Sequence, residues 1–231
     1  MKGLIKRVLS VFLVFSVLAV SFTVSSSAVV SCGSINDGYR CHNNSTDNRK
    51  FHTFGDKTMN YGVGNYGSNH RYFYLSGFNS TFNGYARTAV DQWVYTTDSI
   101  GVTTSISIKE TSTKSQAYFE IICDNTLPSN VLGRTEFFLY QEPVLLNTSG
   151  ALSSDYGWSR CKIHVNALNN TAYNISNSQK RATIAHELGH AMGLSHQNCR
   201  ASSIMCQSGS GTRTATRADA QDLRNINHLY G

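Results

Sequence analysis

Apolar residues recur at the spacing of an amphipathic helix in three segments of the chain. The first segment carries Phe82, Ala86, Ala89, Val90 and Trp93 and follows a capping residue at Asn79 or Ser80. The second covers residues 179–192, where Ser176 and Gln179 have the spacing of a capping box and Gly193 can end the helix. The third follows Thr216 and places Leu223, Ile226 and Tyr230 on one face.

Strand patterns fill the middle of the chain. Residues 71–76 form a short aromatic run, and Val102, Thr104, Ile106 and Ile108 alternate with polar residues. Further short runs cover residues 118–123, 136–140 and 162–166, with Gly and Asn clusters between them. The order of helix, strands, helix, loop and helix predicts an α+β domain.

The N-terminus has the organisation of an export signal. Lys2, Lys6 and Arg7 precede an apolar run over residues 8–22, and small residues up to Ala28 fit a cleavage site that leaves Val29 first. The alternative is an uncleaved membrane anchor, but the run is short for a bilayer span. We therefore expect a signal peptide at 1–28, an irregular polar segment at 29–54 and a globular domain at 55–231. We also expect a secreted protein with no stable membrane insertion after cleavage.

Charge and cysteine content refine this picture. The formal net charge of +6 falls to about +3 without the three basic signal residues, and no basic run or nucleic-acid motif is present, so we expect no nucleic-acid partner. Six cysteines behind an export signal favour disulfides, and the absence of a C-x-x-C pair argues against a thiolate metal site. A Cys199–Cys206 bridge would close a small ring, although pairing with Cys161 or Cys123 stays open.

One motif carries the chemistry. His186 and His190 are four residues apart, so both imidazoles lie on one helix face and can reach one Zn²⁺. Gly193 permits a sharp bend that can return His196 to the metal as a third ligand, which leaves a position open for water. Glu187 lies beside the metal as a candidate general base. A helix whose histidines face solvent or core is the structural alternative.

This motif resembles that of the metzincins, and most closely that of the matrixins, including their short bacterial forms. In Ser203-Ile204-Met205 the methionine matches the one that the family places on a tight turn beneath the metal. The segments around Trp93, residues 162–166 and the terminal Leu229-Tyr230-Gly231 are also similar, so the resemblance covers roughly residues 55–231. It implies a zincin domain with a mixed twisted sheet, a first helix, an active-site helix and a C-terminal helix.

Some features depart from the family pattern. Cys32-Gly33 is all that matches the family's cysteine switch, and His164 is the one residue that matches its structural zinc ligands, so a second zinc is doubtful. The resemblance allows calcium, but no D-x-D-x-D loop is present.

The resemblance implies a monomeric secreted zinc endopeptidase that acts on protein or peptide substrates. In that family a zinc-bound water attacks the peptide bond and Glu187 would serve as the base. Two alternatives remain: a hydrolase of cell-wall peptides, and a zinc-dependent binding protein without turnover. Intact Glu187 argues against the second alternative. A purely structural zinc site would require a fourth protein ligand, which the motif does not supply.

Overall fold

The computed structural model describes residues 40–43, 50–65, 67–77, 79–145, 157–198, 200–208 and 213–231. A sheet of six strands has the order β4-β3-β5-β8-β6-β7. Its strands are β3 (Arg71–Ser76), β4 (Ile108–Glu110), β5 (Phe119–Asp124), β6 (Gly133–Leu139), β7 (Glu142–Val144) and β8 (Arg160–Asn166). Strands β4, β3, β5 and β8 are parallel, whereas β6 is antiparallel to both of its neighbours, so the predicted mixed sheet is confirmed.

Three main helices form where the apolar periodicity predicts them. They are α1 (Ser80–Val94), α4 (Asn177–Ala191) and α5 (Ala220–Tyr230), and two short helices, α2 (Thr97–Ile100) and α3 (Ala167–Ala172), accompany them. The Asn79 side chain caps α1, and Ser176 caps α4 by accepting a hydrogen bond from the Gln179 amide. A reciprocal capping box is present at α5, where Asp219 and Asp222 each bond the other's backbone.

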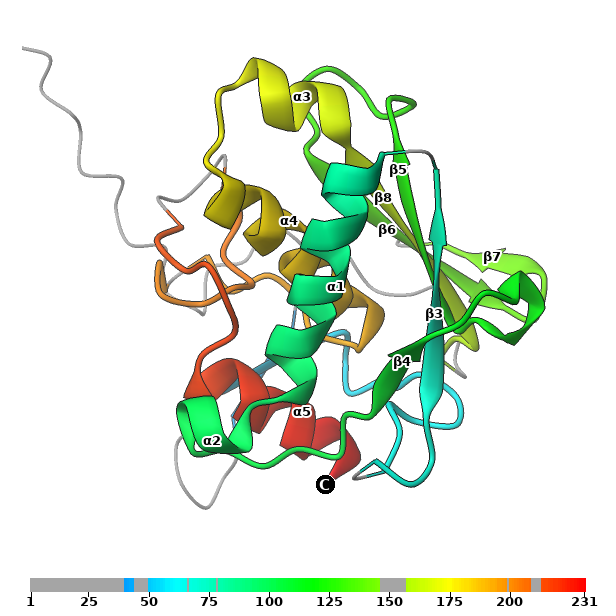
Figure 1. The fold of residues 1–231 in the computed structure, drawn as a ribbon. Coiled ribbons are helices and arrows are strands. Elements are labelled where there is room, and N and C mark those ends of the chain that lie inside the picture. The colour runs from blue at the N-terminus through cyan, green and yellow to red at the C-terminus, as the bar shows by residue number, and fades with distance from the viewer. Residues whose placement is uncertain are drawn as a thin grey trace, which may run out of the picture.

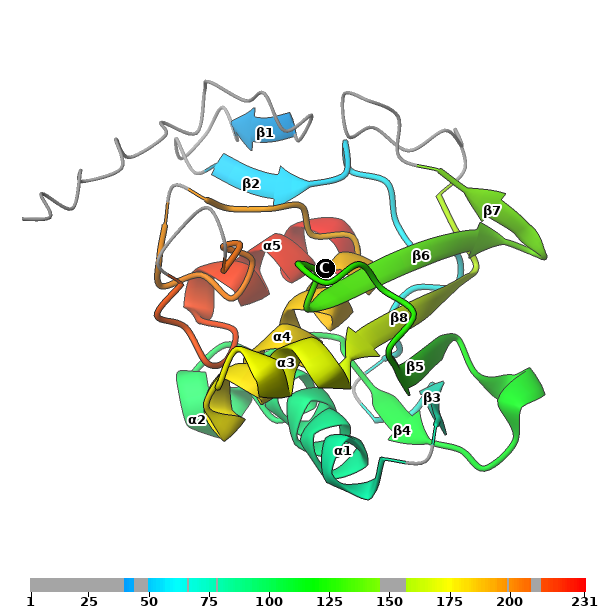
Figure 2. The same ribbon diagram turned by 90° about the horizontal axis from the view of Figure 1, so that it is seen from above.

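Helices α1 and α4 pack against each other, and α4 also contacts β6 and β8. Figures 1 and 2 show both helices on the same side of the sheet, with α5 near the end of α1 that leads to α2. Two buried indoles tie α4 in place. Trp93 Nε1 donates to the Ala185 carbonyl at 2.9 Å, and Trp158 Nε1 donates to the Ala191 carbonyl at 3.0 Å. The backbone of the motif helix is therefore fixed on both sides.

Two local predictions are wrong. The alternation over residues 102–108 predicted a strand, but only its last residue belongs to β4. Thr104 and Ile106 are buried, so the alternation reflects packing. The backbone there bonds outside a ladder, since the Thr96 hydroxyl donates to the Val102 carbonyl and the Ser107 amide donates to the Val63 carbonyl.

The second correction concerns the segment at 29–54, which we expected to be irregular. Strands β1 (Arg40–Asn43) and β2 (Lys50–Thr53) pair antiparallel within it. Phe51 and Phe54 are buried, and the Phe51 ring stacks on His228 of α5 at 4.2 Å between ring centres. Figure 2 shows the two strands alongside α5. Apolar side chains thus hold this end of the segment against the rest of the fold.

Other predictions about the N-terminus and the cysteines fall outside the described residues. The signal peptide at 1–28, Cys32 and Cys199 are among them. Within the described ranges no disulfide is present, and Cys123, Cys161 and Cys206 carry free thiols. A Cys199–Cys206 bridge is therefore not found. No helix in the described part of the chain is long and apolar enough to cross a membrane.

Candidate metal centre

Helix α4 and the turn after it bring the three motif histidines together. His186 and His190 lie one turn apart on α4, and Gly193 follows with a φ of 103°, a left-handed conformation that suits glycine. The chain then folds back, since the Leu194 amide donates to the Gly189 carbonyl at 3.0 Å. As a result His196 Nε2 lies 3.1 Å from His190 Nε2, and His186 Nε2 lies 3.1 Å from the same atom.

The tautomers of two of these histidines follow from their other ring nitrogens. His186 Nδ1 lies 2.7 Å from the Ile204 carbonyl oxygen, and His190 Nδ1 lies 2.8 Å from that of Leu194. A carbonyl can only accept, so both Nδ1 atoms carry the proton. Burial lowers the pKa of His186 well below its usual range and that of His190 to about 4, so both rings are neutral at physiological pH. Each Nε2 therefore presents a lone pair.

Two lone pairs that face each other at 3.1 Å cannot form a hydrogen bond and repel each other unless a cation lies between them. Tetrahedral Zn–N bonds of about 2.0–2.1 Å would place ligand nitrogens about 3.3–3.4 Å apart, close to the distances here. Among the described residues, His186, His190 and His196 are the one group of three or more potential ligands that could hold a metal ion. The donor set fits a zinc ion with one open position.

Glu187 lies next to the triad and is buried. The Thr135 hydroxyl on β6 is 2.8 Å from Glu187 Oε2 and 2.9 Å from the Glu187 carbonyl, so it can donate to either. Burial raises the pKa of Glu187 to about 7, while the Thr135 hydroxyl and the positive charges of Arg213 and Arg134 oppose this rise. A cation at the triad would further favour the ionised form. The carboxyl group is thus held where it can exchange protons near neutral pH.

Comparison with known proteins decides the family. The sequence model of the matrixin family matches residues 89–231, more than half of the chain, and this range contains the whole histidine triad. The chain belongs to the matrixin family. The expected metzincin-type fold and the family resemblance are thereby confirmed for this matrixin domain.

Two solved structures are similar to about three quarters of this chain. Myroilysin is 12% identical, with 75% of this chain and 97% of that one covered and a TM-score of 0.45. Metalloproteinase-II from Bacteroides fragilis is 15% identical, with 72% of this chain and 54% of that one covered and a TM-score of 0.40. No curated protein sequence matches the chain.

Met205 forms the floor of the matrixin site. A Cβ atom at Gly189 on α4 would lie 2.3 Å from Met205 Sδ, so the methionine packs against bare helix backbone between the two helical histidines. The Met205 carbonyl accepts a hydrogen bond from the Gln197 amide at 3.0 Å. Met205 is therefore hydrogen-bonded to the residue that directly follows His196.

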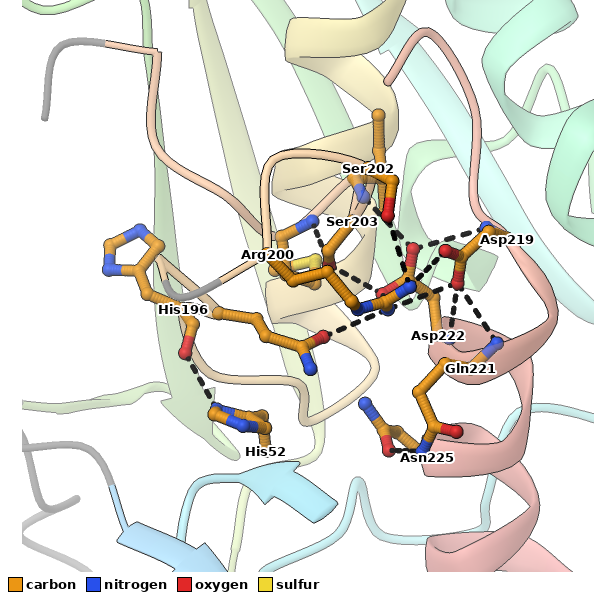
Figure 3. Close-up of polar contacts among 12 residues, drawn as sticks. His52, His196, Arg200, Ser202, Ser203, Asp219, Gln221, Asp222 and Asn225 are labelled. Atoms are coloured by element: carbon orange, nitrogen blue, oxygen red, sulfur yellow. Dashed lines mark hydrogen bonds and ion pairs between the residues drawn. The ribbon is translucent and has the colours of Figure 1, made fainter. Parts of the chain in front are cut away.

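A buried carboxylate on α5 holds the methionine turn (Figure 3). Asp222 is fully buried and accepts hydrogen bonds from the Ser203 hydroxyl at 2.6 Å, the Ile204 amide at 2.9 Å and Arg200 Nη2 at 3.2 Å. Arg200 also forms an ion pair with Asp219, which caps α5. Burial and the neighbouring Asp219 raise the pKa of Asp222 to about 6, against the effect of these donors, so it is ionised at neutral pH.

Strand β2 supports the loop that carries His196. Thr53 pairs with Leu194, the Ser195 amide donates to the His52 carbonyl at 3.1 Å, and His52 Nδ1 lies 3.1 Å from the His196 carbonyl oxygen. Figure 3 shows the His52 ring at this carbonyl, away from the His196 imidazole. The N-terminal segment thus supports the loop that carries the third histidine of the triad, a role that the sequence did not suggest.

A cavity of about 790 Å³ opens beside the triad. Its lining includes the three histidines, Glu187 and the start of β6 at Gly133, Arg134 and Thr135. Strand β6 pairs with β8 on one side, whereas β7 pairs only with residues 137–139 on the other. Residues 133–136 therefore have a backbone edge beside the cavity that pairs with no other described strand.

The structure gives no support for a second metal ion among the described residues. His164 lies between two carboxylates, with Nδ1 3.1 Å from Asp124 and Nε2 3.4 Å from Glu136, but these do not form a further candidate ligand group. Glu136 is also paired with Arg134 at 2.6 Å. The described residues do not support a calcium site either.

Proposed function

We propose that this matrixin domain is a secreted zinc endopeptidase in which His186, His190 and His196 hold the metal and Glu187 is the general base. Membership of the family supports metallopeptidase activity in general. The roles of these residues are supported by the Nε2 lone pairs of His186 and His190, which face each other at 3.1 Å. Next to them, the Glu187 carboxyl group has a pKa of about 7, which suits proton transfer.

A zinc ion bound by the triad would polarise the scissile carbonyl and acidify a water molecule. Glu187 accepts one proton from this water while the water oxygen adds to the carbonyl carbon. When the C–N bond breaks, Glu187 passes the proton to the leaving nitrogen, so the products are a carboxylic acid and an amine. Thr135 keeps the Glu187 carboxyl group oriented during both transfers.

The edge of β6 that pairs with no described strand supports the assignment of a peptide substrate. An extended peptide can add to an unpaired strand edge through main-chain hydrogen bonds. At Gly133 a Cβ atom would lie 2.9 Å from Glu187 Cγ, so only a glycine lets this edge lie so close to the base. Main-chain pairing along residues 133–136 would bring a peptide bond up to the metal centre.

Export is supported by the pattern of Lys2, Lys6 and Arg7, the apolar run after them and the small residues up to Ala28. We propose that the mature chain begins near Val29 and acts as a monomer outside the cell. N-terminal sequencing of the exported protein tests this directly, and an intact Met1 would refute cleavage.

The function is tested by digestion of a peptide library and of cell-wall peptides with purified mature protein, with metal analysis of the same sample. We expect cleavage within peptides, about one zinc ion per chain, loss of cleavage with a chelator and recovery when zinc is restored. Zinc binding without cleavage of any substrate would support a binding protein. Cleavage of cell-wall peptides alone would redirect the substrate assignment.

A further inference from the structure

Arg213 is a cationic side chain of the cavity that the proposed mechanism does not use. It lies among the residues that line the cavity, together with Glu187, Thr183, Tyr173 and Ile175. It is partly buried, and its Nε atom is fully buried and has no hydrogen-bond partner among the described residues. No hydrogen bond or ion pair joins its guanidinium group to any other residue in the part of the chain that the structure describes.

The second guanidinium group in the cavity behaves differently. Arg134 donates to Glu136 Oε1 at 2.6 Å and is therefore paired within the protein. Burial lowers the pKa of Arg213, and the charge of Glu187 acts against this effect. A guanidinium group in water-poor surroundings is stabilised most by a carboxylate, which can accept two parallel hydrogen bonds. Glu187 does not fill this role, because its carboxyl group bonds to Thr135, and no hydrogen bond or ion pair between Glu187 and Arg213 is found among the described residues.

We propose that Arg213 is a specificity residue that binds a carboxylate of the substrate as it enters the cavity. The carboxylate belongs either to an Asp or Glu side chain near the scissile bond or to the C-terminus of a short peptide. This inference rests on the proposed peptidase function. Glu187 lies in the same cavity and its charge acts on Arg213, but no described acid forms a hydrogen bond or ion pair with this guanidinium group, so an acidic substrate group would complete its pairing.

The test uses matched peptides around a cleaved site, each with Asp, Asn or Leu at every position next to the scissile bond, and each with a free or an amidated C-terminus. We expect kcat/KM to be at least about tenfold higher for one acidic peptide than for its neutral partner, because hydrogen bonds between two charged groups are the strong ones. A preference for Asp identifies the side chain as the source, and a preference for the free acid identifies the C-terminus.

Arg213→Gln should lower this ratio toward one. Arg213→Lys should keep part of it, because the positive charge remains but the two parallel donors of the guanidinium group are lost. Arg224→Gln is the matched control, since it removes the same charge from an exposed position on α5 and should leave the ratio unchanged. Equal rates for acidic and neutral peptides with the wild-type protein would overturn the inference. An Arg213→Gln variant that slows all peptides equally would also overturn it, because Arg213 would then act through Glu187.

A binding measurement separates this inference from the proposed function. If no peptide is cleaved, the peptidase proposal fails. The dissociation constants of zinc-binding peptide hydroxamates that contain Asp or Asn then show whether Arg213 binds a carboxylate. Tighter binding of the Asp compound by wild-type protein, lost in Arg213→Gln, supports the carboxylate site. Equal dissociation constants contradict it.

Discussion

Asp222 on α5 accepts a hydrogen bond from the Ile204 amide at 2.9 Å, and the Ile204 carbonyl oxygen lies 2.7 Å from His186 Nδ1. One residue of the methionine turn therefore connects a buried carboxylate on the last helix to the first histidine of the triad. This link fixes the tautomer and the ring orientation of His186, which outer-shell partners commonly do at metal sites.

Replacing Asp222 with Asn should weaken both folding and metal binding. Every neighbour of its two oxygens is a donor, so the new amide group would meet a donor and leave it unsatisfied. We expect unfolding free energy to fall by about 2–4 kcal/mol and zinc affinity by about tenfold. Denaturant titration and competition with a chelator measure these quantities. The exposed Asp91→Asn on α1 serves as control, and equal behaviour of the two variants would contradict the role of Asp222.

Replacing Thr135 with Val removes the hydroxyl that orients Glu187 but keeps the shape of the side chain. We expect kcat to fall by about 10–100-fold with zinc content unchanged, since the carboxyl group loses its donor. Thr135→Ser keeps the hydroxyl and should retain most of the activity. Steady-state kinetics on one peptide compares the three proteins. A Val variant as fast as the Ser variant would show that the Thr135 hydroxyl does not orient Glu187.

Gly189→Ala should destabilise the protein because the new methyl group would overlap Met205 Sδ. We expect a loss of about 1–3 kcal/mol, typical of overpacking in a core. Gly84→Ala on α1 is a matched control, since nothing lies within 4 Å of a Cβ atom there. It should stabilise the helix by about 0.5–1 kcal/mol. Thermal unfolding of both variants checks the contrast, and similar shifts would show that Met205 does not pack as described.

The stability of the metal-free protein should depend on pH through Glu187. Its pKa is about 7 in the folded state against 4.5 in the unfolded chain, so the folded state binds the proton more tightly. Above pH 7 its ionisation therefore costs stability, and this cost disappears as the pH falls toward 4.5. Metal-free Glu187→Gln should thus exceed metal-free wild type by about 3 kcal/mol at pH 8 and match it near pH 4.5. Denaturant unfolding across this range measures the difference, and a constant difference would contradict a buried, perturbed Glu187.

The sequence predicted the parts of the site that lie close together along the chain. His186, Glu187 and His190 share one helix turn, and Gly193 marks the bend before His196, so local spacing alone predicts that they converge. The three main helices were also predictable, because α1 and α5 carry apolar residues at helical spacing and α4 follows the capping pattern of Ser176 and Gln179.

The contacts that hold the site from a distance in sequence could not be predicted. Thr135 is 52 residues from Glu187, and Asp222 is 18 residues from Ile204, so neither pairing leaves a periodic signal. The capping pattern of Asp219 and Asp222 before Leu223 was the available hint, and it points to a helix start and not to a metal site. Strand β2 was missed because Phe51 is its only apolar residue. With Phe54 just beyond the strand, the segment shows no alternation of apolar and polar residues.

The central claim is that three histidines hold zinc while Glu187 moves protons without binding the metal. Zinc content and kcat/KM measured on the same sample of Glu187→Gln test it most directly. We predict about one zinc ion per chain, as in wild type, and a rate at least about 10²-fold lower. A variant that keeps near-normal cleavage would contradict the role of Glu187 as the base, and a variant that loses its zinc would contradict a ligand set of histidines alone.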